Sequence, residues 1–209
     1  MNTGLLDDLR NGIEMHLAPL NVDQYHRMIR DGILDDGESI ELIQGALIYK
    51  DRRDRSGSIM THGPQHLRAL NKLMSLLSLW VMSKRTFLQV QGPIVVGENS
   101  EPEPDCCLIR GTPDDYADRI PGAADVLAVF EVSYSSLLSD RSSKQRLYAS
   151  ARIPIYVIVN LQDGMIEVMT EPCIEDSRYL VQSNYKREET VSIPIDPFGE
   201  LSFTGNDSI

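Results

Sequence analysis

The sequence predicts a mixed α/β domain in which a central sheet is flanked by helices. Residues 126–132 are apolar except at Glu131, and residues 155–159 are apolar throughout. Such runs are typical of strands that are covered on both faces of a sheet. Residues 65–84 instead carry apolar side chains at helical spacing, which predicts a long amphipathic helix.

The N-terminal part is expected to contain a short helix and a β-hairpin. Residues 1–20 show no clear period and are expected to form an N-terminal extension. Asn21 begins a pattern typical of a capping box, which predicts that a helix starts there. Residues 39–43 and 46–49 have strand patterns, and the glycine between them favours a hairpin turn.

Strands dominate the remainder of the chain. After the long helix we expect three strands, one helix and two further strands, at residues 87–96, 105–109, 126–132, 137–151, 155–159 and 165–170. Pro154 is expected to end the helix. Residues up to 203 alternate weakly and favour a β-rich C-terminal end. The sequence thus predicts one domain over residues 21–203 and a polar tail at 204–209.

Composition narrows the class of protein. The 209 residues are 42% hydrophobic, which is enough for one sizeable core. No apolar run approaches the roughly 20 residues that cross a bilayer, and the N-terminus lacks a signal-peptide pattern. Three cysteines without a CxxC pair indicate reduced thiols rather than a metal–thiolate cluster. We therefore expect a cytoplasmic protein without a membrane partner.

The net charge of −11 argues against a simple nucleic-acid-binding module, because binding phosphates normally requires a basic surface. The charge is unevenly distributed, however. Residues 50–55 carry four bases against two acids, and a second basic cluster surrounds Arg141 and Arg146. These local positive patches keep nucleic acid open as a partner.

Three charged residues carry the chemical prediction. Ionised Glu131 inside a buried strand is costly unless a partner or a metal compensates it. Asp105 precedes another strand, and Lys144 follows in a predicted helix. Mg²⁺ prefers carboxylate oxygens, and a lysine can assist at a phosphate. This combination indicates metal-assisted phosphodiester hydrolysis.

Each of these residues also has an ordinary structural explanation. Glu131 can be a buried acid in a salt bridge, and Asp105 can be a turn residue after a proline. Lys144 can form a helical ion pair with Asp140, four residues before it. The order of the three residues together favours the catalytic interpretation.

That order belongs to a longer series of short motifs, at residues 41–45 (ELIQG), 63–66 (GPQH), 104–105 (PD), 130–133 (FEVS), 140–144 (DRSSK), 147–149 (LYA), 153–156 (IPIY) and 159–160 (VN). The series resembles a large bacterial family of restriction-endonuclease-like proteins in the PD-(D/E)XK nuclease superfamily. The resemblance implies the restriction-endonuclease-like core, a mixed sheet with flanking helices. It also implies a site that uses Mg²⁺ or Mn²⁺ to cut DNA, often in a homodimer.

The resemblance also implies roles for individual residues. Asp105 matches the acid of the Pro-Asp motif and Glu131 the second acid, and both would bind the metal. The usual lysine position holds Ser133, so the amine would come from Lys144. Glu41 matches a further carboxylate of the site.

Residues expected to contact the substrate are less sharply indicated. His66 begins the long helix, where a helix N-terminus attracts phosphate, although a capping or packing histidine is the more ordinary explanation. Arg52, Arg53 and Arg141 are candidates for holding DNA phosphates. Tyr134 stands where relatives often carry a polar residue. This difference leaves a second hypothesis, in which the protein has the nuclease fold but is catalytically silent and acts as an assembly or regulatory module.

Other enzyme classes lack their motifs. The chain has no GxSxG elbow, Walker loop, GxGxxG or HExxH pattern, so serine-hydrolase, P-loop, dinucleotide and zinc-protease interpretations have no support. A small-molecule hydrolase on the same scaffold remains as a third alternative.

Overall fold

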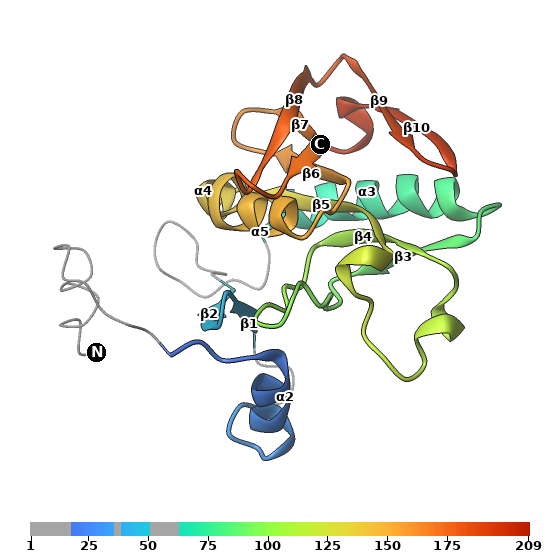
Figure 1. The fold of residues 1–209 in the computed structure, drawn as a ribbon. Coiled ribbons are helices and arrows are strands. Elements are labelled where there is room, and N and C mark those ends of the chain that lie inside the picture. The colour runs from blue at the N-terminus through green and yellow to red at the C-terminus, as the bar shows by residue number, and fades with distance from the viewer. Residues whose placement is uncertain (1–17, 36–38, 51–62) are drawn as a thin grey trace, which may run out of the picture.

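The computed structural model describes residues 18–35, 39–50 and 63–209, and its centre is a six-stranded mixed sheet (Figure 1). In spatial order the strands are β3 (Thr86–Val90), β4 (Cys106–Arg110), β5 (Val126–Ser133), β6 (Ile155–Asn160), β7 (Met165–Cys173) and β8 (Arg178–Lys186). β5 and β6 run parallel, and the other neighbours are antiparallel. The predicted mixed sheet with flanking helices is confirmed.

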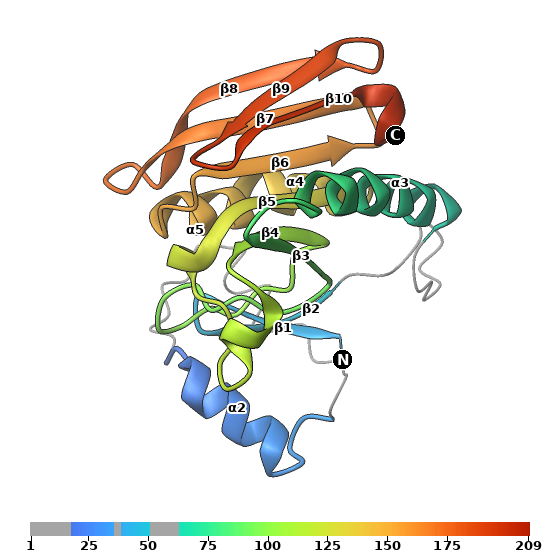
Figure 2. The ribbon, with the colours of Figure 1, turned by 90° about the vertical axis from the view of Figure 1, so that its right-hand side faces the viewer.

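Helices cover both faces of this sheet. The helical elements are α2 (Val22–Arg30), α3 (Pro64–Val81), α4 (Leu137–Ser139), the π-helical turn η3 (Asp140–Lys144), α5 (Gln145–Ser150) and the 3₁₀ turns η1 (Pro113–Tyr116), η2 (Ala123–Asp125) and η4 (Gly205–Asp207). α3 packs on one face together with a separate hairpin formed by β9 (Thr190–Ile195) and β10 (Gly199–Thr204), which lies in front of β7 and β8 in Figure 2. α5 packs on the other face.

β5 is the central strand, and its alternation assigns each side chain to a face. All eight of its residues are buried. Phe130 and Val132 pack in the cluster with α3, whereas Val129 packs in the cluster with α5. Because successive side chains of a strand point to opposite faces, Glu131 points toward α5. The strand thus directs an acid into one of the two covered faces.

A two-stranded hairpin of β1 (Ile40–Ile43) and β2 (Ala46–Tyr49) lies beside the sheet, as predicted. Its turn residues Gln44 and Gly45 both have positive φ, +50° and +81°, which matches the right-handed twist of a tight hairpin. Backbone bonds attach it to the segment before β4, from Glu101 N to Leu42 O and from Gly45 N to Asn99 O, each 2.7 Å long. This attachment fixes the position of β1 relative to the sheet.

Other predicted elements are confirmed with shifted ends. Both reciprocal bonds of the capping box that begins at Asn21 are present. The strand expected at 87–96 is wrong at its end, because β3 stops at Val90. Gln91 follows in the left-handed region with φ +48°, and Pro93 has no N–H to donate to a ladder. The expected helix at 137–151 is present but contains the π-helical turn.

The segment 204–209, predicted as a polar tail, packs on the domain. Ile209 belongs to the core cluster on the α3 face. Lys72 on α3 donates to backbone oxygens of Asn206 and Ile209, at 2.7 and 2.6 Å. One apolar side chain and two bonded backbone oxygens therefore hold this segment on the domain.

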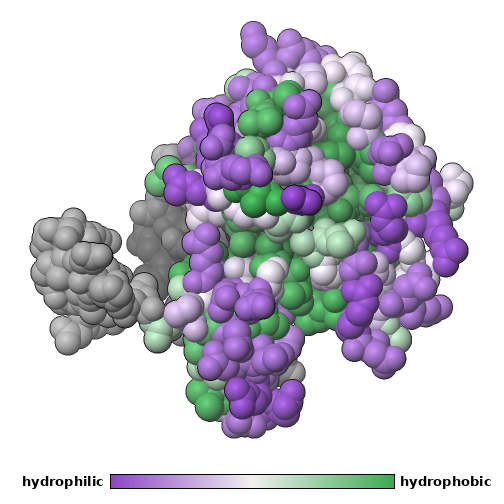
Figure 3. Space-filling model, viewed as in Figure 1, coloured by the Kyte–Doolittle hydropathy of each residue, from purple (hydrophilic) through white to green (hydrophobic). Residues whose placement is uncertain are grey.

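The outer surface mixes polar and apolar side chains. The face in Figure 3 is polar in its upper and lower parts, with apolar residues gathered across the middle. Among the residues that the structure describes, no helix has the length and apolar character needed to cross a membrane.

Replacing Gly45 by alanine tests how the hairpin is held. The new Cβ would lie 2.3 Å from Pro19 Cβ and 2.7 Å from Pro19 Cα, at a φ of +81°. We expect the free energy of unfolding to fall by about 3 kcal/mol in urea titrations, from backbone strain and from the clash. Gly164→Ala is the control, because φ is +64° there but no heavy atom lies within 4 Å of the Cβ. It should lose about 1 to 2 kcal/mol, and equal losses would contradict the packing at Gly45.

Candidate active site

The sheet brings the two predicted metal-binding acids together. In the antiparallel register of β4 and β5, Cys106 lies opposite Phe130, which places Asp105 beside Glu131. The N–H of Asp105 lies 3.4 Å from Glu131 Oε2, and Val132 N donates to Asp105 Oδ2 at 2.9 Å. The two carboxylates thus meet at one end of neighbouring strands.

Lys144 reaches this pair from η3. Its Nζ lies 2.8 Å from Glu131 Oε1 and 3.7 Å from Glu41 Oε1. The side chain is only 14% exposed, so it points into the domain. The alternative partner Asp140 accepts instead from Ser133 Oγ at 2.5 Å and Ser136 Oγ at 2.6 Å. The predicted grouping of two acids and an amine is therefore present.

Glu41 enters the group from β1. Its Oε1 accepts a hydrogen bond from Glu103 N at 2.7 Å, which ties the hairpin to the segment before Asp105. A second amine lies near it, because Lys50 Nζ is 3.9 Å from Glu41 Oε1 and 2.6 Å from Glu103 Oε2. Glu41 thus lies between two lysines.

The predicted substrate-binding residues have different positions. His66 is the third residue of α3, and its Nε2 lies 3.5 Å from Asp105 Oδ1, so the N-terminus of α3 adjoins the site. Arg141 is engaged elsewhere: its guanidinium bonds Glu167 Oε1 at 2.6 Å and Oε2 at 3.0 Å. Arg52 and Arg53 lie outside the described residues.

Comparisons with known proteins identify the family and the fold of this chain. The family described as "Uma2: Putative restriction endonuclease" matches residues 22–204, which is most of the chain. The chain belongs to this family. A crystal structure described as that of a "putative nuclease belonging to DUF820" from Anabaena variabilis ATCC 29413 is 13% identical, with a TM-score of 0.64. The match covers 90% of this chain and 97% of the other, and it shows a shared fold. No curated protein matches the chain.

The site of this Uma2 protein carries more negative than positive charge. Burial, followed by the neighbouring acids Asp140, Asp105 and Glu41, raises the pKa of Glu131 to about 8, although Lys144 opposes this. Burial alone would lower the pKa of Lys144. The charges of Glu131, Glu41 and Asp140 outweigh it and hold that pKa above its usual range. The Lys144 ammonium is therefore shared among several carboxylates.

The pKa values of Asp105 and Asp140 are shifted in opposite directions. Burial disfavours ionised Asp105, but the bond and charge of His66 and the N–H of Val132 bring its pKa below the usual value. Burial raises the pKa of Asp140 despite Lys144 and its two serine partners. Of these two acids, Asp105 is the one better prepared to remain charged.

The donor set fits a divalent cation. Within residues 18–35, 39–50 and 63–209, no three or more His, Cys, Asp or Glu side chains form a ready-made metal cage. Mg²⁺ does not require one, because it usually binds one or two carboxylates and retains several waters. Asp105 and Glu131 supply two such groups, and their excess negative charge is what a cation would neutralise.

Sequence reasoning missed three contributors to the site. Lys50 was assigned only to the basic segment 50–55. Its signal was the hairpin register, in which Glu41 lies opposite Ile48, two residues before Lys50. Glu103, which binds Lys50, has no distinguishing local pattern. Tyr148 donates to Glu131 Oε1 at 3.0 Å. Its signal was the four-residue spacing from Lys144, which places both on one helical face.

The raised pKa of Glu131 predicts a pH-dependent stability of the metal-free protein. Between the ordinary value of 4.5 and the folded value of about 8, the folded state binds a proton that the unfolded state releases. The stability that this group contributes is therefore present below pH 4.5 and is lost as pH rises to about 8. The free energy of unfolding falls by at most about 1.4 kcal/mol per pH unit in this range.

The measurement compares wild type with Glu131→Gln in EDTA, by urea unfolding from pH 5 to pH 9. The wild-type free energy of unfolding should fall relative to that of the variant as pH rises. A constant difference would show that Glu131 titrates at its ordinary pKa.

Proposed function

We propose that this chain is a Mg²⁺-dependent endonuclease that hydrolyses phosphodiester bonds of DNA. The observation that carries the proposal is the meeting of Asp105, Glu131 and Lys144 at one end of the sheet. Membership of a family described as a restriction endonuclease supports the reaction class. Mn²⁺ is expected to replace Mg²⁺, because both accept oxygen ligands.

In this proposal each side chain has one task. Asp105 and Glu131 would hold the metal, with Glu41 as a further ligand or a positioning group. The bound ion would activate water and neutralise charge developing on the phosphate. Lys144 remains protonated and orients the attacking water or stabilises the transition state. Water adds to phosphorus while one P–O ester bond breaks.

Holding DNA requires positive charge outside this acidic group. Arg52 and Arg53 are proposed to contact phosphates. Arg141 is 44% exposed, but its guanidinium is bonded to Glu167 at 2.6 and 3.0 Å, so a phosphate there would share it with that carboxylate. His66 at the N-terminus of α3 is proposed to lie beside the scissile phosphate. A cytoplasmic homodimer is part of the proposal, by analogy with other nucleases of this fold.

The silent-module alternative explains the net charge and Tyr134 but not the buried charges. A buried ion pair is weak evidence of stabilisation, and apolar residues of similar volume often serve a fold as well. Lys144, Glu41 and Glu131 are each mostly shielded from water. A purely structural role gives no reason for this arrangement.

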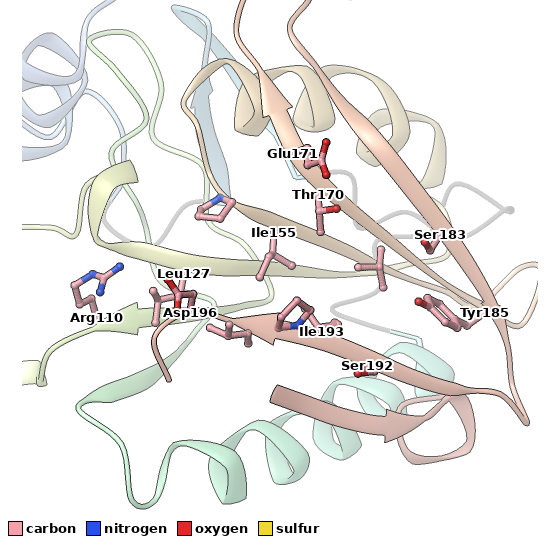
Figure 4. Close-up of a pocket in the computed structure, with 14 residues that line it drawn as sticks. Arg110, Leu127, Ile155, Thr170, Glu171, Ser183, Tyr185, Ser192, Ile193 and Asp196 are labelled. Atoms are coloured by element: carbon pink, nitrogen blue, oxygen red, sulfur yellow. The ribbon is translucent and has the colours of Figure 1, made fainter. Parts of the chain in front are cut away.

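The small-molecule alternative has even less support. A cavity of about 570 Å³ lies between the β9–β10 hairpin and the sheet (Figure 4), lined by residues such as Leu127, Ile155 and Ile193. These three residues belong to the α3 face. Glu131 points to the opposite face, so the cavity and the acids are separated by the sheet.

Plasmid cleavage with Mg²⁺ or Mn²⁺ tests the proposal. We expect Asp105→Asn, Glu131→Gln and Lys144→Met each to lower the cleavage rate about 100-fold or more, because each removes charge that acts on the reacting phosphate. Glu188→Gln and Lys186→Met make the same changes at exposed positions and should cut at the wild-type rate. Single-stranded DNA and RNA substrates define the nucleic acid. Cleavage that survives all three site substitutions, or wild-type protein that cuts none of these substrates, would refute the proposal.

A further inference from the structure

The two carboxylate oxygens of Glu131 have different surroundings. Oε1 accepts hydrogen bonds from Lys144 Nζ at 2.8 Å and from Tyr148 Oη at 3.0 Å. Oε2 lies 3.4 Å from the N–H of Asp105, which is longer than an ordinary N–H···O bond. One oxygen is therefore held by two donors, while the other lies beside the second acid with only a weak contact.

Tyr148 is a rigid donor. It is fully buried and follows Lys144 by four residues, so both lie on the same side of the η3–α5 segment, where both contact Glu131 of β5. Its ring packs edge-on against Tyr156 at a centroid distance of 5.0 Å, and Tyr156 stacks on Tyr179 at 6.2 Å. The row of three rings fixes where the Tyr148 hydroxyl lies.

The partners of these three tyrosines differ. Tyr156 donates to the backbone carbonyl of Asp140 at 3.1 Å, and Tyr179 donates to that of Ile153 at 2.9 Å. Any buried tyrosine hydroxyl needs such a partner. Tyr148 instead donates to a carboxylate of the candidate active site, so its bond acts on a group that the proposed reaction uses.

We propose that Tyr148 is a positioning residue that orients the Glu131 carboxylate for metal binding. The last torsion of a glutamate is broad, and the amine of a lysine is a flexible partner. Two donors on Oε1 fix the carboxylate plane, and this directs Oε2 toward Asp105. Oε2 and Asp105 are then the oxygens presented to a divalent cation. This inference rests on the proposed metal-dependent function.

Tyr148→Phe tests the role, because it removes one oxygen and retains the ring packing. We expect the dissociation constant for Mn²⁺, measured by electron paramagnetic resonance titration, to rise about 10- to 100-fold, as is typical when a partner of a metal ligand is lost. Tyr179→Phe is the matched control: it also removes a buried phenol oxygen from the same row, but one that donates to the backbone carbonyl of Ile153. Its dissociation constant should stay within about twofold of wild type. Thermal unfolding of both variants checks that they fold.

The possible results separate the inference from the proposed function. If Tyr148→Phe binds Mn²⁺ as wild type does while Asp105→Asn and Glu131→Gln bind weakly, the role of Tyr148 is overturned and the metal site stands. If Tyr179→Phe weakens binding as much as Tyr148→Phe, the effect is general loosening, and the inference is again overturned. If wild type, Asp105→Asn and Glu131→Gln all bind Mn²⁺ alike, the metal site fails, and with it the proposed function.

Discussion

The arrangement of this protein depends on one electrostatic constraint, which is the burial of the Glu131 carboxylate in a strand covered on both faces. A charge in such a place must be compensated, because the interior solvates it poorly. Lys144 and Tyr148 supply that compensation from the segment that packs on this face. Asp140, held by two serines, fixes the beginning of η3, and Arg141 on the same turn is tied to Glu167. The helical connection is therefore anchored at several points beside the acid.

The compensation is incomplete, and this is what makes the site reactive in our account. Glu41 and Asp105 add negative charge around the same lysine, and the pKa of Glu131 rises as a result of burial and of these neighbours. Proteins retain such local conflicts mainly where function requires them. The hairpin attachment that brings Glu41 to Lys144 has the same consequence, since it adds a further acid beside that amine.

Sequence patterns predicted much of this arrangement, because they are local. The β1–β2 turn, the stripe of α3 and the apolar runs of β5 and β6 each lie within one stretch of chain. The order of Asp105, Glu131 and Lys144 was informative because two strand ends and one helix follow in a simple topology. The packing of Ile209 on the core and the bond of Lys50 to Glu103 depend on residues far apart in sequence. The end of β3 was missed because Gln91 adopts a positive φ that its residue type does not signal.

A crystal structure of the protein soaked with Mn²⁺, with the ion located by anomalous scattering, tests whether these acids bind a metal. We expect an anomalous peak within coordination distance of Asp105 and Glu131 Oε2, while Lys144 and Tyr148 still contact Oε1. No peak at saturating Mn²⁺, or a peak only at surface acids with Asp105 and Glu131 unchanged, would contradict metal binding at this site.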